Sequence, residues 1–437
     1  MPCRRLVHPG PDTGPNLISW LSSRHAPDPE TESRVRAIIS QVAEQGDDAL
    51  VEFTQRFDAP DFRINQLMVP RQALAEACRR VPERDLVIIS EAAENIRAFH
   101  QRQVRDSWMT TGADGTILGQ LVRPVDRAGL YVPGGQGGAT PLVSSLLMNA
   151  IPAQVAGVGR IFVCSPPTRD GSVNDHILAT AHLLGLESVF AVGSAWAVAA
   201  LAYGTGTIPA VDVIAGPGNI WVTTAKRFLV GRVGIDMIAG PSEIAILADA
   251  AADPSFLAAD MLSQAEHDPL ASSLLISPDQ GLLDAASKEL ARQLGLLPRA
   301  DIAKSSLKSW GGLIKVPDLE SGLELVNTIA PEHFELVVDD PWPLLGKIRN
   351  AGAVFLGHFS PEPVGDYFAG PNHVLPTLRN ARFSSALSVQ TFCKETSLIA
   401  TGPGYIRNHG DKIARLARLE GLEAHARSVE IRFQKGE

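Results

Sequence analysis

The chain has 437 residues, 45% of them hydrophobic and 20% charged, a composition typical of a soluble globular protein with about two or three domains. Its formal net charge of −9 disfavours nucleic acid or an anionic membrane as the main partner. No transmembrane-length apolar run occurs, and the first residues lack the apolar stretch of a secretory signal, so we expect a cytoplasmic protein. The four cysteines lie far apart, which indicates neither a disulfide framework nor a thiolate metal site.

Helical spacing dominates the chain from Glu30 to His100. Apolar residues recur there at intervals of three and four, as in ESRVRAIISQVAEQ. This pattern predicts a series of amphipathic helices.

From Arg123 the pattern changes to short apolar runs that end in glycine or proline, such as RIFVCSPP and VDVIAGPG, each followed by helical spacing. That alternation predicts a parallel sheet wrapped by helices. A second series, with EIAILAD, SSLLISP, GGLIKVP and GAVFLG, predicts a second unit, so we expect an α/β protein with two doubly wound units. Beyond Ser384 the chain closes in two helical patterns, in a segment too small to hold a core alone. It is expected to pack elsewhere, with a partner subunit as one candidate.

Two glycine-rich turns follow predicted strands. Neither G-x-G-x-x-G nor G-x-x-x-x-G-K-[ST] occurs, but GLYVPGGQGGATP begins at Gly129 and IAGPGNIWVT begins at Ile214. Such turns let backbone amides approach a phosphate at a helix start, and they equally serve as plain tight turns. The residues alone leave both interpretations open.

The stretch SQAEHD, at the end of a predicted helix, contains candidate metal ligands. Gln264 and His267 are three residues apart, so their side chains share one helix face and can converge on one ion. In APEHFELV, Glu332 and His333 follow Pro331 and form a candidate acid/base pair, since imidazole titrates near neutrality. A polar helix end and an ordinary turn are the simpler alternatives for these two stretches.

Two later stretches also contain acidic residues and histidines that are candidates for a site. PEPVGDYFAGPNHVLPT is a loop rich in proline and glycine that carries Asp366 and His373. LEGLEAHARS carries Glu420 and His425, for which a solvated terminal helix is the simpler alternative.

Taken together, these motifs resemble the L-histidinol dehydrogenase family nearly from end to end. They appear in the family's order as YVPGG, GPGNIWVTTAKR, IDMIAGPSEI, AEHDP, IAPEHFEL, GDYFAGPNHVLPT and EGLEAH. The resemblance implies a zinc-dependent enzyme that oxidises L-histidinol to L-histidine through L-histidinal, with two successive hydride transfers to NAD. This is the last step of histidine biosynthesis.

The resemblance also implies roles for the polar residues. Two imidazoles, a carboxylate and an amide oxygen form a donor set suited to zinc, and the implied ligands are Gln264, His267, Asp366 and His425. His333 would be the general base for the hydroxyl proton, and Glu332 would help to activate water for attack on the aldehyde. Both reach one substrate only if residues 331–333 form a turn, because neighbours on a strand point to opposite faces. The residues implied to contact substrate are Ser242, Gln264, His267, His333, Asp366, His373, Glu420 and His425.

The implied NAD contacts lie on the two glycine-rich turns and on a third turn. Tyr131 and Asn219 match family positions that contact NAD. Family members often read GAQA where this chain has GSAW, so Trp196 replaces a glutamine that contacts NAD in relatives. An indole can stack but has no carbonyl acceptor, so Trp196 is a cofactor-contact candidate of altered chemistry.

The resemblance implies a homodimer with active sites shared between intertwined chains, in which Glu420 and His425 act across the interface. The expected fold is α/β with two Rossmann-like doubly wound units. The expected parts are an N-terminal arm (1–26), a first α/β domain with most metal and catalytic residues (27–129 with 242–384), an NAD-binding α/β domain (130–241) and a small helical C-terminal segment (385–437).

Other functions stay open at this point. A dehydrogenase of the same fold that acts on another amino or sulfonated alcohol would use the same ligands and the same Glu332–His333 pair. A zinc hydrolase would use metal-bound water with Glu332 as base, but it leaves both glycine-rich turns without a purpose. A non-catalytic protein with a structural zinc is disfavoured because structural sites are dominated by cysteine.

Overall fold

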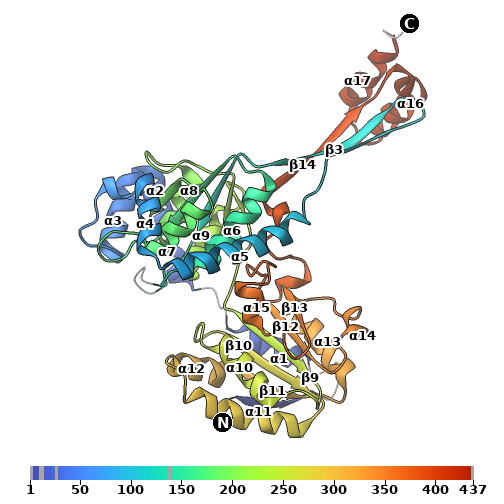
Figure 1. The fold of residues 1–437 in the computed structure, drawn as a ribbon. Helices are drawn as coiled ribbons and strands as arrows, with labels where there is room; N and C mark the ends of the chain where they lie inside the picture. The colour runs from blue at the N-terminus through green and yellow to red at the C-terminus, as the bar shows by residue number, and fades with distance from the viewer. Residues whose placement is uncertain (1–2, 9–13, 25–27, 136–139, 435–437) are drawn as a thin grey trace. The chain divides into compact units, whose positions relative to one another are not determined.

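The computed structural model describes residues 3–8, 14–24, 28–135 and 140–434. The chain divides into two compact units, the first made of residues 1–103 and 126–392 and the second of residues 104–125 and 393–437. Each unit is described by itself. The first unit contains a six-stranded and a five-stranded sheet, and the second contains a three-stranded sheet (Figure 1).

The six-stranded sheet is entirely parallel. Its strands in spatial order are β1 (Arg4–Val7), β11 (Gly311–Lys315), β10 (Ser272–Ser277), β9 (Glu243–Ala248), β12 (His333–Val337) and β13 (Ala353–Leu356). Without β1, this is the order 3-2-1-4-5 of a doubly wound fold, whose strand order reverses between β9 and β12. Every residue of β9, β10 and β12 is buried, as expected for strands covered on both faces.

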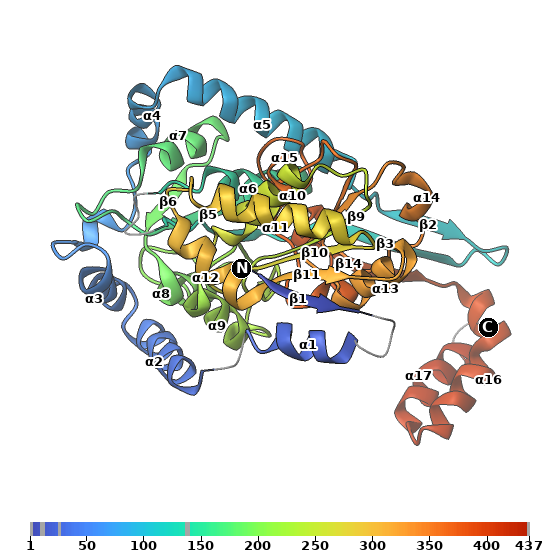
Figure 2. The same cartoon turned by 90° about the horizontal axis from the view of Figure 1, so that it is seen from below.

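Helices cover both faces of this sheet, and α1 and α11 lie on opposite sides of it (Figure 2). One face packs on α10 (Pro254–Ala265), α11 (Gln280–Leu294) and α12 (Ala300–Trp310), and the other on α1 (Gly14–Ser22) and α13 (Leu319–Ile329). Side-chain caps begin several of these helices: Asp253 accepts a hydrogen bond from the Ser255 amide before α10, with Pro254 at its first position. Short helices α14 (Trp342–Leu345) and α15 (Glu362–Tyr367) flank β13.

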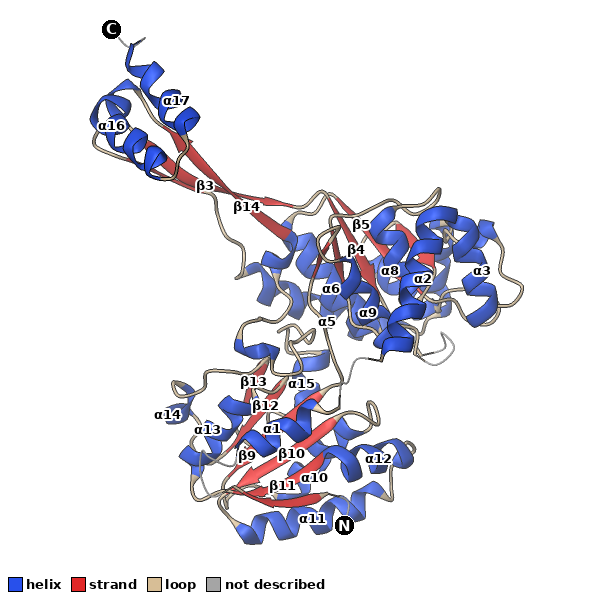
Figure 3. Ribbon diagram, turned by 180° about the vertical axis from the view of Figure 1, so that it is seen from behind, coloured by secondary structure: helices blue, strands red, loops and turns tan. Residues whose placement is uncertain are grey.

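The five-stranded sheet is also parallel and has the same order. Its strands are β6 (Ser188–Ala191), β5 (Arg160–Ser165), β4 (Arg127–Tyr131), β7 (Val213–Ala215) and β8 (Gly234–Ile235). Its helices are α6 (Val143–Ala156), α7 (Asp175–Leu183), α8 (Ser194–Tyr203) and α9 (Ile220–Leu229). The prediction of an α/β fold with two doubly wound units is therefore confirmed (Figure 3).

The segment that the sequence predicts as helical forms α2 (Pro29–Gln45), α3 (Asp47–Phe57), α4 (Arg71–Arg80) and α5 (Glu83–Gln101), with a 3-10 turn at Ile64–Gln66. These helices pack on those of the five-stranded sheet: α2 contacts α8 and α9, α4 contacts α7, and α5 contacts α6. The structure thus differs from the expected grouping of residues 27–129 with 242–384. Helical periodicity shows that a helix has an apolar face, but not which sheet will cover that face.

Within the predicted N-terminal arm (1–26), β1 pairs with β11 at the edge of the six-stranded sheet and α1 packs on that sheet. Two further 3-10 turns, Asn380–Arg382 and Val389–Phe392, lie near the end of the first unit.

The second unit combines two parts of the chain. Its antiparallel sheet has the order β14 (Cys393–Ala400), β3 (Ile117–Pro124) and β2 (Trp108–Thr111), and its helices are α16 (Pro403–Leu419) and α17 (Glu423–Gln434). Compared with the expected C-terminal segment 385–437, the second unit adds residues 104–125, because β3 pairs with β14 along its whole length, and it begins at residue 393 rather than 385. Among the described residues of both units, no helix combines the length and apolar character needed to cross a bilayer.

Candidate active site

The amino end of β12 carries the predicted catalytic pair, and the amino end of β9 carries a predicted substrate contact. Ser242 immediately precedes β9, and His333 is the first residue of β12, paired in register with Ile244. The chain bends at Glu332, after Ala330 in a left-handed conformation (φ 49°), and Glu332 and His333 line the same cavity. The turn that the sequence analysis required is therefore present. Ligands of doubly wound sheets usually bind at the carboxyl ends of the strands, so this edge is the less usual one.

His333 is buried, and its two ring nitrogens have different surroundings. Nδ1 lies 3.1 Å from the main-chain oxygen of Glu243 and 3.1 Å from Oε1 of Gln264. A carbonyl oxygen can only accept, so Nδ1 carries the hydrogen. Nε2 has no hydrogen-bond partner among the described residues, and Oδ1 of Asp366 lies 3.6 Å from it. The neutral ring therefore presents the lone pair of Nε2.

Three carboxylates surround the imidazole. Oε2 of Glu332 and Oε1 of Glu362 each lie 3.7 Å from Nδ1, and Asp366 faces Nε2. Burial by itself would lower the pKa of His333, but these carboxylates raise it to about 10. Burial raises the pKa of Glu332 to about 8, although His333 and the amide of Glu243 act in the opposite direction. Proton uptake at these acids and at His333 is therefore coupled, because the groups share one buried site.

A cluster of metal-ligand type lies beside His333. One ligand atom from each of His267, Glu362 and Asp366 lies within 4.8 Å of the others. Glu362 is buried, and neither of its carboxylate oxygens has a hydrogen-bond partner among the described residues. Its amide donates to Oε1 of Glu335 on β12 at 2.9 Å, which fixes the start of α15.

Glu362 was missed by the sequence analysis, although one signal was available. It precedes Asp366 by four residues in PEPVGDY, a spacing that puts both side chains on one helix face. The proline and glycine content of this stretch predicts a loop, whereas the structure forms the short helix α15 there.

The other predicted residues of the first unit lie nearby with different contacts. Gln264 is fully buried on α10; its Oε1 contacts His333, and its Nε2 has no partner among the described residues. Ser242 and His373 line the cavity, and Nε2 of His373 is likewise buried without a partner in the described part of the chain.

The carboxyl edge of the five-stranded sheet forms the other side of the site. Tyr131 ends β4, and its hydroxyl oxygen accepts a hydrogen bond from the amide of Ser194 at 3.2 Å. Burial raises the pKa of Tyr131 to about 12, so its hydroxyl stays protonated. After β7, Asn219 accepts hydrogen bonds from the amides of Trp221 and Val222 and caps α9. These turns lie where the strand order reverses between β4 and β7, which is where doubly wound folds bind ligands.

The turn between β7 and α9 depends on glycine and on a buried ion pair. Gly216 has φ 126°, and a Cβ at this position would lie 2.0 Å from the main-chain oxygen of Tyr131. Nζ of Lys226 donates to the oxygen of Gly216 at 2.9 Å and pairs with Asp236, whose Oδ2 accepts from the Gly216 amide at 2.8 Å. The amide and the carbonyl oxygen of Gly216 are therefore both held by the Lys226–Asp236 ion pair.

A single cavity of about 480 Å³ joins these two edges. Its lining includes Tyr131, Gly134, Gly135, Ser194, Pro217, Gly218, Asn219, Ser242, His267, Glu332, His333, Glu362, Asp366 and His373. No lysine or arginine is among the described residues that line it. Residues 136–139 of the first glycine-rich turn lie outside the described residues.

Trp196, the third predicted cofactor contact, does not line this cavity. It is buried in α8, and its ring stacks on Phe53 and Phe57 of α3 with centroid distances of 5.6 Å each. The indole that replaces an amide thus packs in an aromatic cluster. Ser194, two residues earlier, lines the cavity instead.

The two predicted residues of the second unit are exposed. Glu420 is the C-cap residue of α16, and His425 lies on α17. The first unit by itself gathers His267, Asp366 and the unpredicted Glu362, with Gln264 adjacent to His333.

Comparisons with known proteins agree over nearly the whole chain. A family model described as histidinol dehydrogenase matches residues 22–433. A histidinol dehydrogenase of Oleidesulfovibrio alaskensis is 60% identical, over 99% of this chain and 100% of that protein. The one from Bacillus subtilis is 49% identical, over 97% and 98%. The crystal structure of histidinol dehydrogenase from Elizabethkingia anophelis has a TM-score of 0.91 and 34% identity, covering 99% of this chain and 98% of that one.

Proposed function

The chain belongs to the histidinol dehydrogenase family and is an oxidoreductase of histidine biosynthesis, and from this premise we propose its detailed reaction. It oxidises L-histidinol to L-histidine through L-histidinal, uses two NAD and one zinc site, and performs the final step of histidine biosynthesis. The observation that carries the proposal is the cavity in which a Glu332–His333 pair and a cluster of metal-ligand type face the carboxyl-end turns of a doubly wound sheet.

His333 is proposed as the general base. Its Nδ1 is held by the oxygen of Glu243, so Nε2 is the nitrogen that can take the proton of the substrate hydroxyl. A base at neutral pH must be unprotonated, yet the surrounding carboxylates raise the pKa of His333 to about 10. Part of their charge therefore has to be balanced by a cation, as zinc bound at Asp366 would do.

Glu332 is proposed to orient and deprotonate the water that attacks the aldehyde. Its Oε2 accepts from the amide of Glu243 at 2.9 Å, which leaves its other oxygen available to a water in the cavity. The raised pKa of Glu332 suits a group that must take up a proton near neutrality.

Zinc fits the residues present. Glu362 is buried without a hydrogen-bond partner among the described residues, and its carboxylate converges with His267 and Asp366. Because the described lining holds no cationic side chain, a bound cation would balance this charge. Imidazole and carboxylate donors suit zinc. The proposed ligands are Gln264, His267, Asp366 and His425, with Glu362 as an additional acidic group of the site. When bound, zinc supplies positive charge and open coordination positions that hold the substrate's imidazole and amine.

NAD also fits. Gly218, Asn219 and the start of α9 form a turn at the carboxyl edge of the sheet, where a helix start attracts phosphate. When bound, NAD accepts the hydride from substrate carbon. Tyr131, Ser194 and Asn219 would line its site; Ser242 and His373 would contact substrate.

A homodimer with shared sites is supported by the composition of the second unit. Among its described residues, the buried apolar side chains are Val125, Ala414 and Ala426, which cannot form a core. Its large exposed apolar side chains are Val104, Trp108, Met109, Leu118, Ile399, Leu416, Leu419, Leu422 and Ile431. Such a surface calls for a covering partner, and a second copy would bring Glu420 and His425 to a site.

The test is an NADH assay on purified protein, paired with metal analysis. L-histidinol should yield about two NADH per molecule, and chelation should remove zinc and activity together, with both restored by zinc. Turnover of simple or sulfonated amino alcohols without turnover of L-histidinol would assign another substrate. Failure to bind NAD would point to a hydrolase.

A further inference from the structure

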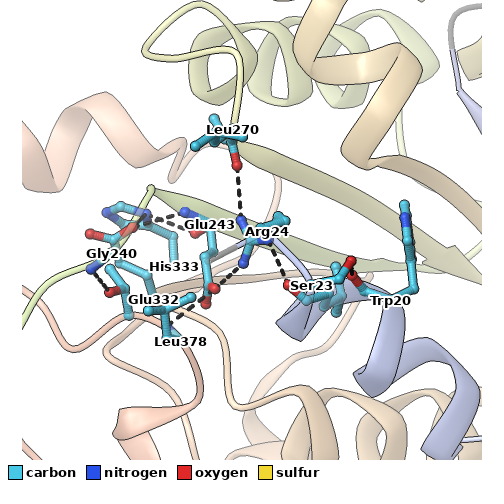
Figure 4. Close-up of polar contacts among 12 residues, drawn as sticks. Trp20, Ser23, Arg24, Gly240, Glu243, Leu270, Glu332, His333 and Leu378 are labelled. Atoms are coloured by element: carbon cyan, nitrogen blue, oxygen red, sulfur yellow. Dashed lines mark hydrogen bonds and ion pairs between the residues drawn. The ribbon is translucent and has the colours of Figure 1, made fainter. Parts of the chain in front are cut away.

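Arg24, after α1, is buried in an ion pair with Glu243 (Figure 4). The side chains of the two residues are 1% and 7% exposed. Nη2 of Arg24 pairs with Oε1 of Glu243, Nε donates to the oxygen of Leu21 at 3.1 Å, and Nη1 donates to the oxygen of Leu270 at 3.2 Å. Each nitrogen of the guanidinium group thus has a defined acceptor.

Glu243 holds both proposed catalytic side chains through its main chain. Its amide donates to Oε2 of Glu332 at 2.9 Å, and its carbonyl oxygen accepts from Nδ1 of His333 at 3.1 Å. One residue therefore fixes the orientation of Glu332 and selects the tautomer of His333. Its side chain points to Arg24, away from these contacts (Figure 4).

A further polar contact and a small cavity define the surroundings of this side chain. Oε1 of Glu243 also accepts from the amide of Leu378 at 3.2 Å. Beside it lies a cavity of about 220 Å³ that Arg24, Glu243 and Pro331 help to line. Because this space is free, Glu243 has room to move if Arg24 is lost, and its main chain would move with it.

We infer that Arg24 and Glu243 are positioning residues, a clamp that holds the main chain of Glu243 against Glu332 and His333. This inference rests on the proposed function, because it assigns a purpose to a contact with the proposed catalytic pair. Neither Arg24 nor Glu243 is among the residues that line the substrate cavity, so the clamp acts through the contacts of Glu243 with Glu332 and His333.

The first test compares Arg24→Ala with Arg5→Ala. Arg5 is a matched control because it also joins the N-terminal segment to an acid, Asp284, but in an exposed pair. In R24A, kcat should fall by about tenfold to a hundredfold, the scale of a small misplacement of catalytic groups, with little change in KM and zinc content. R5A should match the wild type. Equal kcat in R24A and R5A would overturn the inference.

Two conservative variants cover the case in which R24A does not fold. Arg24→Lys keeps the charge but lacks the three guanidinium nitrogens that each have an acceptor, and Glu243→Gln keeps the shape but not the charge. Both should have a lower kcat than the wild type and a shifted pH profile of kcat, which loss of stability alone would not move. If both variants matched the wild type in kcat and pH profile, the clamp would have no catalytic effect.

A crystal structure of R24K or R24A gives a readout that does not depend on the proposed reaction. The distances from the Glu243 amide to Glu332 and from the Glu243 oxygen to His333 should lengthen. Unchanged distances contradict the inference even if the wild type oxidises L-histidinol. If the distances lengthen but the wild type does not oxidise L-histidinol, the clamp stands and the proposed function fails.

Discussion

Nε2 of His333 lies 3.6 Å from Oδ1 of Asp366, so the proposed base and a proposed zinc ligand are direct neighbours. The protonation of His333 must therefore depend on whether the negative charge of Asp366 is balanced by a metal ion. Coupling of this kind allows a metal site to set the protonation of a base that is not itself a ligand.

Replacing His333 by Asn should separate catalysis from metal binding. The side-chain amide can still donate to the oxygen of Glu243 but cannot take a proton, so turnover should fall by about two to four orders of magnitude. Zinc content should stay at the wild-type level. His182→Asn, the same change at an exposed position on α7, is the control for both measurements. Unchanged turnover in H333N would overturn the assignment of the base.

Replacing Glu332 by Gln should slow the aldehyde step more than the alcohol step, as measured separately with L-histidinal and L-histidinol. Burial raises the pKa of Glu332 to about 8, so its carboxylate form increases as the pH rises through that value. The rate of the wild-type aldehyde step should therefore rise with pH over this range, and E332Q should lose that dependence. If both steps slow equally, the residue has a structural role.

The fold was predictable because its signals are local. Buried strands such as EIAILA and SSLLIS are continuous apolar runs, and caps such as Asp253–Pro254 mark helix starts. The packing of α2–α5 on the helices of the five-stranded sheet was not predictable, since the apolar face of an amphipathic helix does not indicate which part of the fold will cover it. The pairing of residues 104–125 with the C-terminal strand is likewise a long-range choice.

The site residues that lie within the motifs could be predicted from the sequence. The structure adds residues whose contacts join distant parts of the chain. His267 and Asp366 are brought together as the resemblance implies. Arg24 and Glu243 lie 219 positions apart, and an arginine near the N-terminus has no local pattern that indicates a buried partner. Trp196 was interpreted through a family position, whereas its packing depends on Phe53 and Phe57, which sequence spacing does not connect to it.

Replacing Glu362 by Gln should weaken zinc binding. The change removes a buried negative charge that faces His267 and Asp366 while keeping the side-chain volume. Zinc affinity, measured by competition with a chromogenic chelator, should fall by about tenfold to a hundredfold. Glu91→Gln, at an exposed position on α5, should retain the wild-type affinity. Equal affinity in E362Q and wild type would remove Glu362 from the metal site.

Replacing Lys226 by Met should disturb the turn that is proposed to bind NAD. Lys226 and Asp236 are buried, so removing one partner leaves an uncompensated charge and should cost about 3–5 kcal/mol of stability. Because Gly216 loses its partner, NAD affinity measured by calorimetry should fall while zinc content is retained. The control is Lys347→Met, which removes an exposed pair with Glu320. NAD affinity equal to that of K347M would show that the pair does not shape the cofactor site.

Two co-expressed chains with different tags can decide whether His425 acts across a dimer interface. If sites are shared, a heterodimer of His333→Asn and His425→Asn chains has one intact site and should show about half the wild-type activity. The matched control pairs a wild-type chain with an H333N/H425N double variant. In that control each shared site contains one altered residue, so the heterodimer should be inactive. The opposite result, with the first heterodimer inactive and the control half active, would show that each site is built within one chain. Both heterodimers carry the same two substitutions, so a difference between them reports the arrangement of the site rather than the stability of the protein.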